Sequence, residues 1–95
     1  INNLIILGKT SDCLNLDPIK SKIEGLGIKA IEVDGHSIND LSSSLKEADS
    51  SDQLHCILAK TIKGKGSSIM ENKQNWHYWN NMEQNQIDIT RKDLE

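Results

Sequence analysis

Two lysines and two glycines alternate in the segment Lys63-Gly64-Lys65-Gly66, and these residue types suit the binding of an anion. Glycines let the backbone approach a ligand closely, and lysine ammonium groups supply point charges that suit phosphate. The segment matches neither a Walker A loop nor the Gly-x-Gly-x-x-Gly fingerprint. On composition alone, a solvated turn with incidental lysines is the favoured interpretation.

All aromatic residues of the chain lie in the segment Trp76-His77-Tyr78-Trp79. Rings around a histidine can form a pocket, and the neutral imidazole of His77 can accept and donate protons near pH 7. The alternative is a satellite cluster in which the rings cover an edge of the core. The residue types alone favour that alternative.

A few other side chains have suitable chemistry but weaker context. Asn2 offers an amide oxygen, which suits Mg²⁺, although a single Asn at a strand end is more often a cap or turn residue. His36 and His55 are assigned no role, because one lies in a turn before a helix and the other within a strand. Cys13 and Cys56 have no metal or redox spacing, so we expect free core thiols in a reducing compartment.

Strands and helices are predicted to alternate and to position these segments. Apolar runs predict strands over Leu4–Leu7 (buried and closed by Gly8), Ile28–Val33 (one face partly exposed) and Leu54–Ala59 (covered on both faces). Because helices are expected between them, the fold class is α/β with a parallel sheet and the order β-α-β-α-β over residues 1–59.

Two helices are predicted between these strands. The first begins with Asp17 as its N-cap and Pro18 at its first position. The second begins at Ser37, with Asp40 three residues on as a variant of the capping box. Their apolar stripes consist of Ile19, Ile23 and Leu26 in the first helix and of Ile38, Leu41, Leu45 and Ala48 in the second.

The periodic pattern ends after residue 59. Residues 60–86 form a long irregular segment, and such loops in compact domains are usually functional or disordered. We interpret this segment as an active-site loop, followed by the start of a C-terminal helix over 87–95 that Thr90 caps. Ligands of open parallel sheets bind beyond the carboxyl ends of the strands, where residues 2–4 and 60–77 are expected to lie.

Composition excludes several classes of protein. The 95 residues are a one-domain length, and the net charge of −3 is spread over interspersed charges, so no nucleic-acid partner is expected. No run approaches the roughly 18 apolar residues of a membrane span, and no charged start precedes an apolar segment, so we expect no signal peptide and a cytoplasmic protein. The chain opens on an apolar run without Met, and we expect it to be a fragment.

Several separated motifs together resemble the transketolase family. The run Lys60–Ser67, followed by Met70-Glu71-Asn72 and Trp76-His77, is similar to the stretch that closes the family's diphosphate-binding domain. Residues Ile31–His36 resemble the strand and turn before the family's next helix. Residues Asn2–Thr10 resemble the end of its metal-binding motif. The motifs occur in order and with matching spacing over nearly the whole chain.

The resemblance implies a role for each of five residues. Asn2 would bind a divalent metal, Mg²⁺ or Ca²⁺, through its side chain, and Leu4 through its backbone carbonyl. Ile6 would lie near the thiazolium region of thiamine diphosphate, and Lys63 near the diphosphate. His77 would touch the diphosphate and the substrate end of the site, and is the catalytic candidate. The cofactor itself would stabilise the carbanion, while the protein binds and orients it.

The chain also departs from the family's pattern. The Gly-Asp-Gly that opens the metal motif is absent, and with it the expected Asp ligand. The glutamate that activates the cofactor's aminopyrimidine belongs to another domain. Tyr78 and Trp79 follow His77 where better-known members have Gly and soon a Pro, and Leu7 replaces an Asp that is common before Gly8. These departures indicate a divergent subgroup and leave the substrate open.

The resemblance implies the C-terminal part of the diphosphate-binding domain of an enzyme. That enzyme would transfer a two-carbon ketol unit between sugar phosphates, using thiamine diphosphate and Mg²⁺. Its partner would be the rest of the parent enzyme, expected as a homodimer, or a second subunit that carries the pyrimidine-binding domain. The isolated chain is expected to be inactive. Two alternatives remain, an enzyme like deoxyxylulose-phosphate synthase with the same fold and a non-catalytic scaffold or interaction module.

Overall fold

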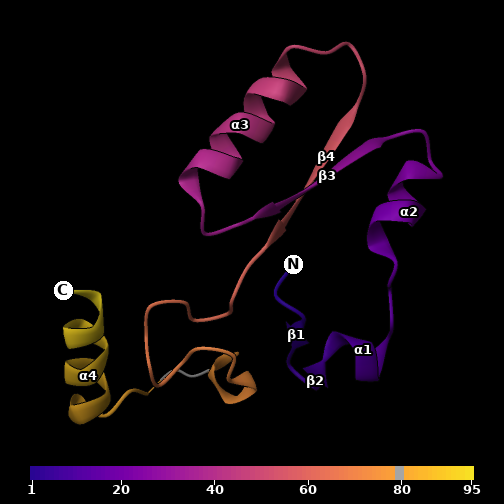
Figure 1. Cartoon of the computed structure of the whole chain (residues 1–95). Helices are drawn as coiled ribbons and strands as arrows, with labels where there is room; N and C mark the ends of the chain where they lie inside the picture. The colour runs from indigo at the N-terminus through magenta and orange to yellow at the C-terminus, as the bar shows by residue number, and fades with distance from the viewer. Residues whose placement is uncertain (79–80) are drawn as a thin grey trace. The chain divides into compact units, whose positions relative to one another are not determined.

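The computed structural model describes residues 1–78 and 81–95 of the chain. These residues form two compact units (Figure 1). The first unit consists of Ile1 and Leu16–Thr61, and the second consists of Asn2–Asn15 and Ile62–Glu95. Trp79, the last residue of the predicted aromatic cluster, lies outside the described residues.

The first unit is built on two parallel strands, β3 (Lys29–Asp34) and β4 (His55–Lys60). Helix α3 (Ile38–Asp49) joins them, because parallel strands need a crossover connection. Helix α2 (Ile19–Glu24) precedes β3, and in Figure 1 it lies on the opposite side of the strand pair from α3. This arrangement confirms the predicted α/β class with a parallel sheet.

Ile1 continues the pairing on the side of β4. Its nitrogen lies 2.6 Å from the Ala59 carbonyl oxygen, and its own carbonyl accepts from Thr61 N at 2.9 Å. Ile1 thus bonds to Ala59 and Thr61, the residues on either side of Lys60, and this is the hydrogen-bond pattern of parallel strands. The start of the chain therefore runs beside β4 in the direction that the sequence predicts, but only at Ile1.

The prediction of a buried strand over Leu4–Leu7 is wrong. Strand β1 (Leu4–Ile5) pairs antiparallel with β2 (Gly8–Lys9), so the run turns back on itself. Ile6 and Leu7 form the two-residue turn and are 50% and 75% exposed. A short apolar run does not reveal by its pattern that the chain reverses within it, and the sequence was misread for that reason.

The predicted cap of the first helix is also wrong. Helix α2 has Pro18 as its N-cap, which offers no side-chain acceptor, in place of Asp17. The helix ends at Glu24, so Leu26 lies beyond it and is 77% exposed instead of completing an apolar stripe. One further helical turn, α1 (Thr10–Cys13), precedes α2.

The start of α3 is predicted correctly, but its buried face is not. Ser37 Oγ accepts from Asp40 N at 3.2 Å, which confirms the cap. The fully buried residue of the helix is Ser44, whereas Ile38 and Leu45 are 82% and 59% exposed. The helix therefore presents a narrower face to the strands than its apolar stripe predicts.

The core of the first unit is small. Among the described residues, Ala30 on β3 and Leu58 on β4 are the only buried apolar residues, at 5% and 6% exposure. The rest of β4 is half-buried or exposed, so the prediction of a strand covered on both faces is wrong. Strand pairing therefore contributes much of what holds this unit together.

The second unit consists mainly of turns, with a short 3₁₀ helix, η1 (Gln74–Trp76), and a longer helix, α4 (Gln84–Leu94). The predicted Thr90 cap is wrong, because Thr90 lies inside α4. The helix begins with a capping box between Glu83 and Gln86. That box uses Glu where the common pattern has Ser or Thr, so the sequence signal was missed.

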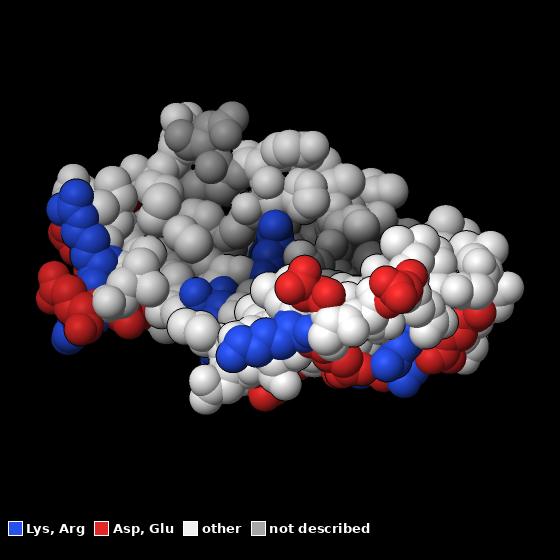
Figure 2. Space-filling view, turned by 90° about the horizontal axis from the view of Figure 1, so that it is seen from above, with Lys and Arg blue, Asp and Glu red and all other residues white. Residues whose placement is uncertain are grey.

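The described helices include none long and apolar enough to cross a membrane. On the face seen in Figure 2, acidic and basic side chains lie next to one another, without a block of one sign. This distribution agrees with the interspersed charges of the sequence.

Gly35, which follows β3, packs closely against the end of β4, and its substitution tests this packing. Its N–H donates to Lys60 O at 2.7 Å, and a Cβ there would lie 2.5 Å from Thr61 Cγ2 and 2.9 Å from Lys60 O. Gly35→Ala should therefore lower the free energy of unfolding by about 1–3 kcal/mol, because backbone must shift to admit the methyl group. Urea denaturation of the protein measures this quantity.

Gly25→Ala is the matched control for Gly35→Ala. Gly25 has a right-handed helical conformation, and a Cβ there would have its nearest neighbour at 3.3 Å. We expect it to be neutral or slightly stabilising. Equal losses of stability in the two variants would contradict the close packing of Gly35 against the end of β4.

Candidate functional site

The second unit contains every residue to which the sequence analysis assigns a role, namely Asn2, Leu4, Ile6, Lys63 and His77. These residues come from two stretches of chain, with the first unit inserted between them. A hydrogen bond joins the two stretches directly, since Gln74 Nε2 donates to Ile6 O at 2.5 Å. The fold therefore gathers the predicted residues into one unit, although their roles stay predictions.

Asn2 takes part in a turn at the start of the β1–β2 hairpin. Its Oδ1 accepts from Leu4 N at 3.0 Å, which is the turn role that the sequence analysis weighed as the alternative. An amide oxygen has two lone pairs, so this bond leaves one for a cation. The next residue, Asn3, has a φ of 59°, and its carbonyl accepts from Thr10 N at 3.0 Å.

A metal site cannot be assembled from acidic side chains, His and Cys in the part of the chain that the structure describes, since no three of them come together. The donors that fit a hard cation here are the Asn2 amide oxygen and backbone carbonyls. Mg²⁺ requires near-octahedral oxygen coordination and usually keeps waters or binds substrate phosphates. These donors fit a cation that also takes ligands from a bound diphosphate.

The segment Lys63–Ser68, here called the glycine–lysine loop, needs its glycines for conformational reasons. Gly64 and Gly66 have φ values of 72° and 97°, which residues other than glycine rarely adopt. A Cβ on Gly64 would also lie 2.7 Å from Met70 Cβ and 2.8 Å from the Met70 carbonyl oxygen. The loop thus folds tightly onto the residues after it, and Asn72 N donates to Lys63 O at 2.9 Å.

The two lysines of the loop have different surroundings. Lys65 Nζ lies 3.4 Å from Glu71 Oε1, which also accepts from Gly66 N at 2.9 Å. Lys63 is half-buried and has no ion-pair partner among the described residues. Lys65 therefore serves the loop itself, whereas Lys63 keeps its positive charge available for an anion.

Helix α4 holds the loop from the C-terminal side. The Asp93 carboxylate accepts from Ser68 N at 2.7 Å and from Ser68 Oγ at 2.6 Å. Ser67 is buried, and its hydroxyl lies 3.2 Å from Thr90 Oγ1. The sequence analysis missed these contacts because they join residues far apart in the chain and carry no local pattern.

His77 contributes a buried nitrogen without a partner. Its Nδ1 has no hydrogen-bond partner among the described residues. Its backbone N–H donates to Gln74 O at 3.0 Å, and its ring meets the Tyr78 ring edge-on, with centroids 4.7 Å apart. An unpaired buried polar atom costs about 1–3 kcal/mol, so this nitrogen is a place where a ligand or water is favoured.

The other residues noted in the sequence do not form a site. Tyr78 is 73% exposed, so it covers no core. His55 lies within β4 as predicted, its Nδ1 is 2.6 Å from Gln53 O, and its Nε2 is buried without a partner among the described residues, as His77 Nδ1 is. Both cysteines are free, but the expectation of core thiols is wrong for Cys13, which is exposed, while Cys56 is half-buried.

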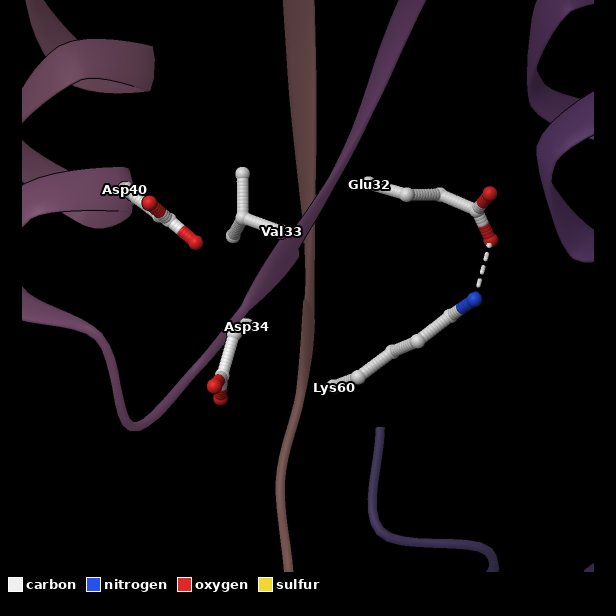
Figure 3. Close-up of a pocket in the computed structure, with 5 residues that line it drawn as sticks. All are labelled: Glu32, Val33, Asp34, Asp40 and Lys60. Atoms are coloured by element: carbon white, nitrogen blue, oxygen red, sulfur yellow. Dashed lines mark ion pairs between the residues drawn. The ribbon is translucent and has the colours of Figure 1, made fainter.

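The first unit contains a pocket of about 350 Å³ at the end of its strands (Figure 3). Its lining residues are Glu32, Val33, Asp34, Asp40 and Lys60. In Figure 3, Lys60 points to Glu32 on one side of the strands, while Asp34 and Asp40 lie on the other, and the Lys60–Glu32 ion pair measures 3.1 Å. The lysine is already neutralised, so the pocket is a weaker anion site than the glycine–lysine loop.

Comparison with known proteins finds several relatives. The chain is 32% identical over 77 residues to an apulose-4-phosphate transketolase subunit of Actinobacillus succinogenes, a match covering 81% of this chain and 28% of the relative. It is 39% identical over 62 residues to the transketolase of Homo sapiens, covering 65% of this chain and 10% of the relative. No family model matches the chain.

The fold has a similar solved structure. A transketolase crystal structure from Campylobacter jejuni superposes with a TM-score of 0.73 and 27% sequence identity, covering 78% of this chain and 12% of that one. The chain therefore spans 28% or less of the length of these relatives.

The contact between α4 and the glycine–lysine loop should depend on pH. The hydrogen bonds from the Ser68 hydroxyl and backbone N–H hold the pKa of the Asp93 carboxyl below its ordinary value of 3.8. Because this pKa is depressed in the folded state, the contact stabilises the protein above pH 3.8 and is lost as the pH falls through the lower folded pKa. NMR signals of the Ser68 amide, followed during acid titration, should report this loss.

Two substitutions on the same helix test the assignment. Asp93→Asn should remove the acid transition of the Ser68 amide, while Asp88→Asn, whose carboxylate accepts from Gln84 Nε2, should leave it in place. An unchanged transition in Asp93→Asn would show that another group controls the loop.

Proposed function

We propose that this chain, which belongs to the transketolase family, forms one wall of a thiamine diphosphate site in a larger enzyme. That enzyme transfers a two-carbon ketol unit between sugar phosphates. The observation that carries the proposal is that His77 Nδ1, buried and without a hydrogen-bond partner among the described residues, belongs to the same compact unit as the residues matched to cofactor binding.

The residues present fit the charge of the cofactor. Asn2 Oδ1 and the Leu4 carbonyl would supply two oxygen ligands to Mg²⁺, or to Ca²⁺, with further ligands from the diphosphate and from the rest of the enzyme. Lys63, which has no ion-pair partner among the described residues, would offset the remaining negative charge of the diphosphate. Thiamine diphosphate supplies the carbanion-stabilising chemistry when bound.

His77 and Ile6 would act on the reacting end of the cofactor. The imidazole of His77 would hold or donate a proton at Nδ1, toward the diphosphate or the substrate. Ile6, half exposed on the turn of the hairpin, would provide apolar contact to the thiazolium region and exclude water there. Each of these roles rests on the match to the family and on the placement of the residue in the second unit.

The enzyme needs more than this chain. The chain spans 28% of a relative whose name describes one subunit of an enzyme, and two further relatives have names of the same kind. We propose that the pyrimidine-binding part comes from the rest of the parent protein, in a homodimer, or from a separate subunit, in the cytoplasm. The isolated chain would then be inactive.

A second candidate function has specific support. The chain is 41% identical over 56 residues to the 1-deoxy-D-xylulose-5-phosphate synthase of Campylobacter jejuni, a match covering 57% of this chain and 9% of the relative. Product analysis separates the two enzymes, because only this candidate forms 1-deoxy-D-xylulose 5-phosphate. A protein that neither transfers a ketol unit between sugar phosphates nor forms 1-deoxy-D-xylulose 5-phosphate, and that binds no thiamine diphosphate, would instead be an interaction module.

Substitutions in the complete protein test the site. His77→Ala should lower kcat by about a hundredfold or more, the usual contribution of a positioned acid or base. Asn2→Ala should raise the Mg²⁺ concentration required for half-maximal activity by about tenfold or more, since even outer-shell partners are worth that much. Ketol transfer between sugar phosphates, followed at varied Mg²⁺, measures both effects.

His36→Ala is the control, because His36 is an exposed histidine of the first unit with no proposed role. It should change kcat less than about twofold. If His77→Ala and Asn2→Ala are as active as the control, the site assignment is incorrect.

A further inference from the structure

Gln74 connects the two halves of the candidate site through two different groups. Its side-chain Nε2 donates to Ile6 O at 2.5 Å, across a separation of 68 residues. Its backbone carbonyl accepts from His77 N at 3.0 Å. One residue therefore bonds to both Ile6 and His77, the residues matched to the thiazolium region and to the substrate end of the site.

The position of His77 depends on backbone contacts of this kind. Its Nδ1 makes no hydrogen bond within the described residues, so on that side no bond fixes the orientation of the ring. The ring's described aromatic neighbour, Tyr78, is largely exposed. The hydrogen bond from His77 N to Gln74 O fixes His77 relative to Gln74 at the end of η1, and the Gln74 side chain in turn bonds to the hairpin at Ile6 O.

The contact requires a side chain at position 74 that can donate a hydrogen bond. A backbone carbonyl such as Ile6 O is an acceptor only, so it needs a donor from the side chain. The other end of the amide, Oε1, faces Gly8 and lies 3.7 Å from the position that a Cβ on Gly8 would occupy. A carboxylate at position 74 would have no hydrogen to donate and would repel Ile6 O.

We propose that Gln74 is a positioning residue for His77. Its hydrogen bond links η1 to the β1–β2 turn and thereby holds the imidazole in the position where it would contact the cofactor. The proposal rests on the function proposed above. Gln74 itself touches no reacting atom, and its effect reaches the site through His77.

Two substitutions of Gln74 and one neighbouring control test this proposal in the complete protein. Gln74→Glu removes the donor and adds a charge, whereas Gln74→Met removes the donor with similar size and no charge. Asn75→Asp adds the same charge to the same 3₁₀ helix, at an exposed residue. The imidazole of His77 is followed by NMR through a pH titration without cofactor, and the binding of thiamine diphosphate with Mg²⁺ is measured by calorimetry.

Both Gln74 variants should shift the titration curve of His77 and raise the Kd for thiamine diphosphate by about fivefold, the effect of one lost hydrogen bond. Asn75→Asp should change Kd less than about twofold and leave the His77 curve in place. Unfolding midpoints should be similar in all three variants, which separates positioning from loss of the fold.

An unchanged His77 curve in both Gln74 variants would overturn the proposal, whether or not Kd changes. Equal effects of Asn75→Asp and the Gln74 variants would overturn it too. Failure of the proposed function gives a different result, because the unsubstituted protein would then bind no thiamine diphosphate. The His77 titration would still decide whether Gln74 positions the imidazole.

Discussion

The hydrogen bonds between Ile1 and the end of β4 are the constraint on which the candidate site depends. They place Ile1 parallel to β4, with Ile1 N on Ala59 O and Thr61 N on Ile1 O. The chain continues from Ile1 into Asn2–Asn15 and from Thr61 into Ile62–Glu95, so both stretches of the second unit leave from hydrogen-bonded neighbours. Stretches that start together can meet at little cost in chain entropy, and this is how residues from opposite ends of the chain reach one unit.

Within the second unit, charge and hydrogen bonding separate residues that shape the site from residues that are open to a ligand. Glu71 forms an ion pair with Lys65, and Asp93 accepts hydrogen bonds from Ser68, so these groups fix the glycine–lysine loop. Lys63 and His77 Nδ1 have no such partners among the described residues. A diphosphate with its metal ion carries the charge and oxygen atoms that would satisfy both.

The sequence predicted the parallel sheet and the Ser37 cap, because local patterns carry this information, whereas the roles of the site residues stay predictions. It failed where one pattern fits two structures. The apolar run from Leu4 turns into a hairpin, and Leu26 lies beyond the end of its helix. Gln74 and Asp93 were missed for a different reason, since their partners lie 68 and 25 residues away and no spacing rule connects them.

Paramagnetic broadening tests the central claim, that this chain forms part of a thiamine diphosphate site, most directly. Mn²⁺ favours the same octahedral oxygen coordination as Mg²⁺ and broadens the NMR signals of nearby residues. With Mn²⁺ and thiamine diphosphate bound to the complete protein, signals of Asn2, Leu4, Lys63 and His77 should broaden. Broadening that requires no thiamine diphosphate, or the absence of broadening at these four residues when it is bound, would contradict the account.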